Sequence, residues 1–208
     1  MAQTGQVQAY PIEWYERVKG LYEEHQEKLS EYIELLLWWN NKINLISRSI
    51  NKEELACHVE HSLLSYPLLD NDQTVWDLGT GGGLPGIPLA IVNPNCRLIL
   101  NDSVNKKIMA SKNICKKMGL EQVAFTKGDF RKMAYQEGDL AVTKHAFSLD
   151  DFFSARGVDQ LKKVVFYKGY PVEEKNADQI IRDKKCTIYT LEHLGSFYEG
   201  KALYVCNH

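Results

Sequence analysis

Residues 75–86 read VWDLGTGGGLPG, which predicts a buried strand, a carboxylate, a glycine-rich loop and then the first turn of a helix. Closely spaced glycines let the backbone lie flat against a ligand, where any side chain would collide with it. The helix that follows offers unpaired N–H groups and the positive end of its dipole. The stretch therefore predicts a loop that binds a nucleotide-type cofactor.

Two cofactors compete for this loop. Residues 81–86 match the G-x-G-x-x-G dinucleotide pattern, and Asp102 lies 21 residues after the first of these glycines. Two residues earlier, the pattern D-x-G-x-G-x-G begins at Asp77, and an acid directly before the loop is typical of enzymes that use S-adenosylmethionine (SAM). Asp77 would repel a pyrophosphate and attract a sulfonium and an α-ammonium group. This charge argument favours SAM over a nicotinamide dinucleotide.

The composition is that of a globular protein with a sizeable core, at 208 residues, 44% hydrophobic and 25% charged. The longest apolar run, residues 35–39, is too short to span a bilayer, and we expect no signal peptide. Five cysteines without a C-x-x-C pair predict reduced thiols and a cytoplasmic location. A net charge of −2 gives no global attraction for nucleic acid, so RNA binding would need a local basic patch.

The first part of the chain has a helical pattern. Residues 1–10 are polar and aperiodic, which predicts a frayed terminus. From about 11 to 66 the period is helical, with one apolar stripe formed by Leu29, Tyr32, Ile33, Leu36 and Ile43. Asn51 followed by Glu54 resembles a capping box that opens a helix through residue 63. Pro67 and Asn71-Asp72 then mark a linker, so we expect an N-terminal helical region over residues 1–70.

Residues 71–208 alternate between strand and helix patterns, which implies a parallel sheet with crossover helices. Strands are expected at 74–78, 97–101, 123–127, 140–143, 164–167, 187–191 and 202–206, with later helices near 148–160 and 173–183. The connection between the last two strands is too short for a crossover, so they must pair antiparallel. The expected fold is an α/β, Rossmann-like class I SAM methyltransferase domain. Its mostly parallel seven-stranded sheet carries a C-terminal antiparallel hairpin and an N-terminal helical extension.

Several segments carry a resemblance to one family across residues 28–170. They are LWWNNKINL at 37–45, HVEHSL at 58–63, DLGTGGGLPGIPLA at 77–90, NDSxxKK at 101–107, MGL at 118–120 and KG at 168–169. In these segments the chain resembles the RsmG (GidB) small-subunit ribosomal RNA methyltransferases, which methylate N7 of a guanine in 16S rRNA using SAM. The tryptophan–asparagine segment and the Pro-Gly-Ile-Pro ending make the resemblance specific.

The resemblance implies a set of cofactor-binding residues. The methionine end of SAM is assigned to Asp77, Gly79, Thr80, Gly81, Gly83 and Leu84, the ribose to Asp102 and Ser103, and the adenine border to Asp129 and Phe130. The chain departs from the family where Lys144-His145-Ala146 stands in place of Ser-Arg-Ala. His145 therefore replaces a permanent cation beside the cofactor and RNA with a group that titrates near neutrality. It joins the cofactor-binding set and is the one candidate for a catalytic role.

Basic, amide and histidine side chains form the candidate RNA-binding set. These are Asn40, Lys42, Asn44, Arg48, His58, His61, Lys106, Lys107, Lys144 and Lys168. A lysine-rich helix over residues 106–117 is either a solvated surface or a phosphate track. Asn40 and Asn44, four apart, either read RNA or cap the helix end, and Trp38 and Trp39 either stack on bases or lie in the core. Cys57-His58-x-x-His61 lacks a second ligand cluster, so we expect no metal.

Guanine N7 carries an in-plane lone pair, so the implied reaction needs no general base. We expect catalysis by positioning, with SAM as cofactor and 16S rRNA, the small ribosomal subunit or its precursor as partner. The protein is expected to be a monomer and to have no membrane partner. Two alternatives stay open. The replaced arginine motivates a catalytically weak relative that binds SAM and rRNA, and a net charge that does not demand RNA leaves room for a methyltransferase acting on a small molecule or a protein.

Overall fold

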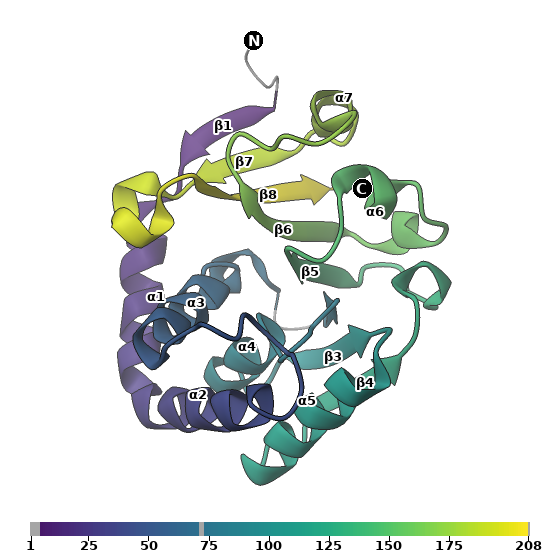
Figure 1. Ribbon diagram of the computed structural model, residues 1–208. Coiled ribbons are helices and arrows are strands. Elements are labelled where there is room, and N and C mark those ends of the chain that lie inside the picture. Colours follow the sequence, from purple (N-terminus) through teal and green to yellow (C-terminus); the bar gives the residue numbers. More distant parts are fainter. Residues whose placement is uncertain (1–4, 71–72, 208) are drawn as a thin grey trace.

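An eight-stranded mixed sheet forms the centre of the computed structural model, which describes residues 5–70 and 73–207 (Figure 1). The strands are β1 (Gln6–Ala9), β2 (Thr74–Leu78), β3 (Arg97–Asp102), β4 (Val123–Lys127), β5 (Leu140–Lys144), β6 (Lys163–Gly169), β7 (Thr187–Thr190) and β8 (Lys201–Asn207). The helices are α1 (Ile12–Glu24), α2 (Gln26–Asn40), α3 (Lys52–Leu63), α4 (Gly86–Val92), α5 (Asn105–Lys117), α6 (Leu149–Phe153) and α7 (Ala177–Asp183). Short 3-10 turns follow at Tyr66–Leu68, Phe130–Lys132, Val158–Gln160, Glu192–Leu194 and Ser196–Tyr198.

The strand order is β1-β7-β8-β6-β5-β2-β3-β4, and strands β2 to β6 pair in parallel. Strand β8 runs antiparallel to both β6 and β7, which confirms the expected C-terminal hairpin. The expectation of seven strands is wrong, because residues 6–9, which were expected to be frayed, form β1 and pair in parallel with β7. Residues 1–4 of the expected frayed terminus lie outside the described residues. β1 supplies partners to backbone groups that β7 would otherwise leave unpaired at the sheet edge.

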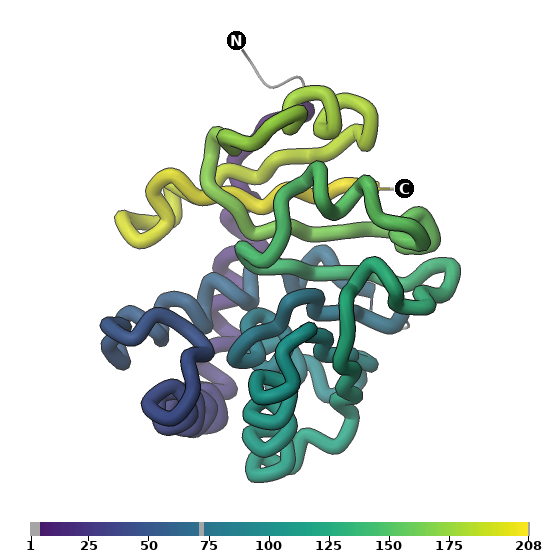
Figure 2. The backbone as a smooth tube through the Cα atoms, turned by 45° about the vertical axis from the view of Figure 1, so that its right-hand side comes forward, coloured from purple at the N-terminus to yellow at the C-terminus, as the bar shows by residue number. Residues whose placement is uncertain are grey.

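Two apolar clusters cover the two faces of the sheet, as alternation along the strands requires. On β6, Val165 and Tyr167 face a cluster built with α1 to α5, whereas Val164 and Phe166 face a second cluster with α6 and α7. The first cluster contains side chains of both the expected N-terminal helical region and the expected SAM-binding domain. In the backbone view of Figure 2 these two parts of the chain lie against each other. The boundary at residue 70 stays a prediction.

The N-terminal helices follow the expected pattern in most respects. The four members of the apolar stripe that lie on α2, from Leu29 to Leu36, are buried, whereas Ile43 lies beyond the end of α2 and is half-buried. The Asn51 side chain accepts a hydrogen bond of 2.8 Å from the Glu54 N–H, which confirms the cap of α3. Two later helices are shorter than expected, since 148–160 divides into α6 and a 3-10 turn and the other begins at Ala177. The linker residues 71–72 lie outside the described residues.

The cysteine expectation is partly wrong, because Cys186 and Cys206 form a disulfide. The antiparallel register pairs Thr187 with Val205, and the next pair outward brings the two cysteine Cα atoms to 4.1 Å. The other three cysteines are free thiols. Among the described residues, no helix has the length and apolar character needed to cross a bilayer.

Candidate active site

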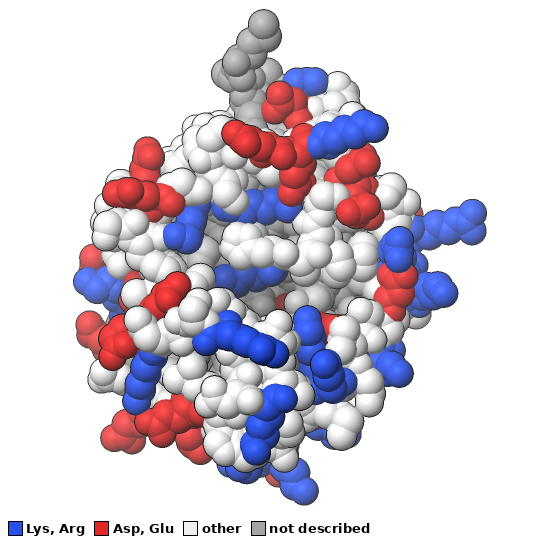
Figure 3. Space-filling model, in the orientation of Figure 1, with Lys and Arg blue, Asp and Glu red and all other residues white. Residues whose placement is uncertain are grey.

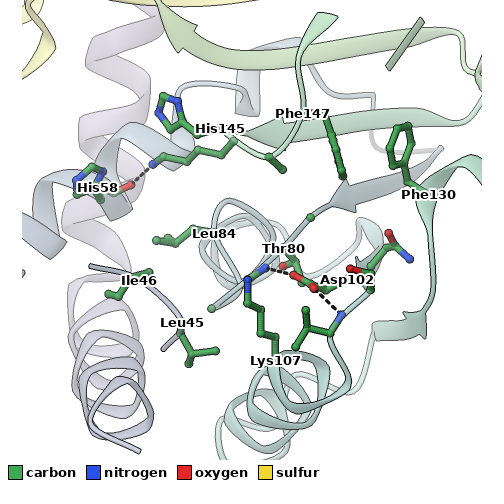
Figure 4. A pocket seen from close by; sticks show the side chains of 18 of the residues that line it. Leu45, Ile46, His58, Thr80, Leu84, Asp102, Lys107, Phe130, His145 and Phe147 are labelled. Atoms are coloured by element: carbon green, nitrogen blue, oxygen red, sulfur yellow. Dashed lines mark hydrogen bonds between the residues drawn. The ribbon is translucent and has the colours of Figure 1, made fainter. Parts of the chain in front are cut away.

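A cavity of about 830 Å³ opens at the carboxyl ends of the parallel strands (Figure 4). It lies where the strand order turns from β2 outward to β3 on one side and to β5 on the other, which is the usual ligand position in open α/β sheets. One wall comes from the glycine loop and the end of β3, and another from residues that follow β4 and β5. Residues 45–58, between α2 and α3 and on α3 itself, supply a third wall.

Asp77, the last residue but one of β2, holds the glycine loop from below. Its Oδ2 accepts a hydrogen bond of 2.6 Å from the Thr80 hydroxyl and one of 2.9 Å from the Gly86 N–H. The side chain is 0% exposed, and burial raises the pKa of its carboxyl to about 7. Asp77 and Gly83 are not among the residues that line the cavity. In this arrangement the Asp77 carboxylate holds the loop from behind the cavity wall, and its expected attraction for the ligand stays a prediction.

The loop depends on glycine at two further positions. Gly79 has a φ of 75°, and a side chain there would collide with Ala146 after β5. At Gly82, a Cβ would stand 2.6 Å from the Leu36 side chain of α2. The loop is thus pressed between β5 and the N-terminal helices, and its backbone faces the cavity through Gly79, Thr80, Gly81, Gly82 and Leu84.

Asp102 closes β3 beside this loop, as the sequence predicts. Its Oδ2 accepts a hydrogen bond of 3.0 Å from the Gly81 N–H, and its Oδ1 accepts one of 2.8 Å from the Val104 N–H at the start of α5. These contacts fix a carboxylate whose remaining lone pairs can accept hydroxyl groups from a ligand. Ser103 lies next to it on the cavity wall.

An aromatic pair forms the opposite part of the cavity wall. The rings of Phe130 and Phe147 lie with centroids 4.1 Å apart, and both line the cavity. Asp129 lines it as well, but both of its carboxylate oxygens accept hydrogen bonds from Arg131, which hold the pKa of that carboxyl at about 2. Phe147 was not expected from the sequence, because its position depends on how the chain turns after β5.

Lys144, the last residue of β5, and His145 both line the cavity. Figure 4 shows His145 and His58 of α3 on the same side of the cavity. The Lys144 ammonium donates hydrogen bonds to the His58 carbonyl at 2.9 Å and to the Ser62 hydroxyl at 3.1 Å. Burial lowers the pKa of Lys144 to about 7. Desolvation and the nearby Lys144 lower the pKa values of His58 and His145 to about 4, so both imidazoles are neutral at pH 7.

Three members of the expected RNA-binding set have other partners. Asn40 is the last residue of α2, where its Oδ1 accepts hydrogen bonds from the Leu45 and Ile46 N–H groups, so it caps the turn. His61 is 1% exposed and packs on Tyr167 in the core.

Lys168 is buried, and its ammonium donates hydrogen bonds to Glu174 at 2.5 Å and to the Phe147 carbonyl at 2.7 Å. These contacts correct the assignment of Asn40, His61 and Lys168 to RNA.

The other members of that set remain accessible. Exposed positions are held by Lys42, Asn44, Arg48 and Lys106, while His58, Lys107 and Lys144 line the cavity. Asn44 lies beyond the end of α2, so its spacing of four residues from Asn40 does not place the two on one helix face. Among the described residues, no group of three His, Cys, Asp or Glu side chains is placed to hold a metal ion.

Apart from His58, the residues of the third cavity wall were not predicted as site residues. Leu45, Ile46, Ser47 and Ile50 line the cavity from the loop after α2, together with Leu55 of α3. The available signal was the apolar Leu45-Ile46 pair, which lies between the polar residues Asn44 and Ser47.

Comparison with known proteins identifies the family. The family model described as "GidB: rRNA small subunit methyltransferase G" matches residues 25–196. Ribosomal RNA small subunit methyltransferase G of Chlorobaculum tepidum is 37% identical over 161 residues, covering 76% of this chain and 74% of that protein. The same-named proteins of Chlorobium limicola and Bacteroides fragilis are 48% and 40% identical over 102 and 107 residues. These two matches span about half of each protein, 46% and 52%.

Solved structures share the fold at low sequence identity. Magnesium protoporphyrin IX methyltransferase from Synechocystis, solved with bound SAM, has a TM-score of 0.58 at 17% identity and covers 82% of this chain and 89% of that one. An RNA methyltransferase from Salinibacter ruber, solved with S-adenosyl-L-homocysteine, has a TM-score of 0.51 at 18% identity and covers 72% and 88%. The fold is that of the Rossmann-like SAM methyltransferases. The chain belongs to the GidB family of rRNA small subunit methyltransferases, which are SAM-dependent enzymes.

Proposed function

We propose that this chain transfers the methyl group of SAM to N7 of a guanine in 16S rRNA. The observation that carries the proposal is the shape of the cavity, in which the glycine loop and Asp102 face a wall made by α3, Lys144 and His145. Sites for small ligands commonly measure about 300–1,000 Å³. A cavity of about 830 Å³ is near the upper end of that range, which supports a donor and an extruded base in one space.

The residues on the loop side fit SAM. The backbone of Gly79, Gly81 and Gly82 can approach a ligand closely, and Asp102 has free lone pairs for ribose hydroxyls. Phe130 offers an apolar surface next to them for a base. When bound there, SAM supplies a methyl group on a positively charged sulfur.

The residues of the chain contribute placement rather than proton transfer. The N7 lone pair of guanine is available without a base, so the protein must orient the acceptor and keep water out. Such positioning contributes on the order of 7–11 kcal/mol to lowering a barrier. The base becomes cationic on methylation, and the low pKa values of His58 and His145, about 4, leave both rings uncharged beside it at pH 7.

The accessible basic side chains support an RNA acceptor. Figure 3 shows Lys and Arg side chains gathered around and below the central hollow of this face, although the net charge of the chain is −2. Phosphates are the groups that such side chains bind in RNA. The proposed partners are the small ribosomal subunit or its precursor, and the protein is proposed to act as a cytoplasmic monomer.

The test is methyl transfer from labelled SAM to deproteinised 16S rRNA and to immature small subunits, followed by mapping of the labelled base. We expect label at N7 of one guanine, with 23S rRNA as the unlabelled control. Tight SAM binding without label on any RNA would contradict the proposal and favour a non-catalytic binding protein. Label on a protein or a small molecule would identify a different acceptor.

A further inference from the structure

An exposed tryptophan lies between two lysines on the surface formed by α2 and α5. Trp38 of α2 is 49% exposed, and the Lys42 ammonium stands 4.3 Å from the centroid of its ring. The Lys117 ammonium, at the end of α5, stands 5.3 Å from the same centroid. Trp39 packs edge-to-face against the indole at 5.2 Å, which fixes its orientation. A half-exposed indole with two ammonium groups over its ring therefore lies where the two helices meet, and a base that stacks on it takes the place of an ammonium.

This surface continues along α5 toward the cavity. Lys106, Met109, Asn113 and Lys117 follow one another at spacings of three and four residues, so they share one face of the helix. Lys107, at the cavity end of that helix, lines the cavity. At a rise of 1.5 Å per residue, Lys117 lies about 15 Å further along the helix axis. Helices α2 and α5 lie side by side in both backbone views (Figures 1 and 2).

Exposed apolar side chains occur along the same surface, from the start of α5 to Trp38. Five large hydrophobic side chains of the described residues are exposed, and three of them, Trp38, Val104 and Met109, belong to α2, to α5 or to the residue that precedes α5. Lysines at 112 and 116 are exposed on α5 as well. These apolar side chains alternate with exposed lysines along α5, so the surface offers both ring or apolar contacts and positive charges to a ligand.

We propose that Trp38, Lys42, Lys117 and the exposed face of α5 bind a flexible, unpaired segment of the rRNA next to the methylated base. A base stacks on the indole, and the lysines hold the flanking phosphates. Aromatic platforms bordered by basic side chains are the usual means of binding single-stranded nucleic acid. Lysine is depleted at protein–protein interfaces, which argues against a protein occupant. The identity of the RNA rests on the proposed function.

The test compares Trp38→Ala and Lys117→Ala with two matched controls. Ile12→Ala removes another exposed apolar side chain, which is 56% exposed on α1, and Lys28→Ala removes an exposed lysine from the same helix as Trp38. The affinity for deproteinised 16S rRNA is measured at several salt concentrations, with SAM affinity measured by calorimetry and KM for RNA in the transfer assay.

We expect Trp38→Ala to weaken RNA binding about tenfold with an unchanged salt dependence, because stacking releases no counterions. Lys117→Ala should reduce the slope of log affinity against log salt by about 1. Both variants should raise the KM for RNA and keep the SAM affinity of the wild type, and both controls should behave as the wild type.

RNA affinities of both variants equal to those of the controls would overturn the proposal. A loss of affinity for assembled subunits without a loss of affinity for deproteinised rRNA would also overturn the proposal, because the surface would then bind a ribosomal protein. If the wild-type protein bound rRNA but methylated another acceptor, the proposed function would be wrong. The RNA affinities of the variants and controls would still test the binding surface.

Discussion

The Tyr32 hydroxyl of α2 donates a hydrogen bond of 3.1 Å to the carbonyl of Gly82, in the middle of the glycine loop. Both residues are buried, and Leu36, one turn further along α2, fills the space that a side chain on Gly82 would occupy. The N-terminal helices therefore form the rear support of the loop. The expected division into a helical region and a SAM-binding domain describes the sequence pattern, but the binding loop takes its shape from both.

Replacing Tyr32 by Phe should destabilise the protein and weaken SAM binding. The buried Gly82 carbonyl loses its hydroxyl partner, which costs about 1–3 kcal/mol in the free energy of unfolding. SAM affinity should fall because the loop backbone is less firmly fixed. Denaturant unfolding and calorimetry measure the two effects.

Tyr10→Phe is the matched control for this variant. The Tyr10 hydroxyl donates a hydrogen bond of 2.7 Å to the Leu64 carbonyl, also in the core but not at the cavity. It should lower stability by a similar amount and leave SAM affinity intact. If Tyr32→Phe also kept its SAM affinity, the hydrogen bond to Gly82 would be structural and nothing more.

Asp102→Ala should reduce SAM affinity about 10- to 150-fold, which corresponds to losing a hydrogen bond to a charged group. The substitution removes the proposed ribose acceptor and also frees the Gly81 and Val104 N–H groups. Asp129→Ala provides the comparison, because Arg131 already occupies both oxygens of that carboxylate and a smaller loss is expected. Equal SAM affinity for wild type and Asp102→Ala, by calorimetry, would contradict the assignment.

Local pattern was sufficient to predict the part of the site that is continuous in sequence. The loop of residues 77–86 and the acid at Asp102 are set by strand ends and glycine spacing, which a single sequence displays. The cap at Asn51 and the antiparallel C-terminal strands were predicted for the same reason, because each depends on a few neighbouring residues or on one short connection.

Contacts between distant segments were beyond this kind of reasoning. His61 and Lys168 look like surface residues by type, but the first is enclosed by aromatic rings and the second by its ion pair with Glu174. Strand β1 pairs with β7, which lies near the other end of the sequence, so no local pattern in residues 6–9 predicts it. The sequence predicts a carboxylate at Asp77 but not where its side chain points. Only the fold shows that the carboxylate lies under the loop, where it accepts a hydrogen bond from the Gly86 N–H.

Acid should destabilise this protein through His61. Burial lowers the pKa of its imidazole well below 6.5, and neither ring nitrogen has a hydrogen-bond partner among the described residues. Above pH 6.5 the ring is neutral in both the folded and unfolded states, so it adds no pH dependence. Below pH 6.5 the His61 ring binds a proton in the unfolded state but stays neutral in the folded state. The free energy of unfolding then falls by up to about 1.4 kcal/mol per pH unit for this group.

His61→Phe should remove this share of the pH dependence. A phenyl ring can pack in the same aromatic surroundings of Tyr167, Phe197 and Tyr198 without a group to protonate. The pKa values of His58 and His145, about 4, leave two further contributions between pH 6.5 and 4 in both proteins. Urea unfolding at pH 7, 6 and 5 tests the difference, and parallel curves for wild type and variant would rule the mechanism out.

His145→Arg should retain methyl transfer. His145 is exposed at the cavity mouth, so a guanidinium there can extend into water toward an RNA phosphate, and KM for RNA should fall while SAM affinity stays constant.

The backbone at this position has a φ of 56°, a region that Asn adopts more readily than most residues. His145→Asn therefore keeps the turn and removes the ring. If both variants bind SAM normally but lose most of kcat, the neutral imidazole itself contacts the reacting base and the position is catalytic. If His145→Asn keeps kcat and His145→Arg loses it, a permanent positive charge beside the methylated base is harmful, and histidine serves here because it is neutral.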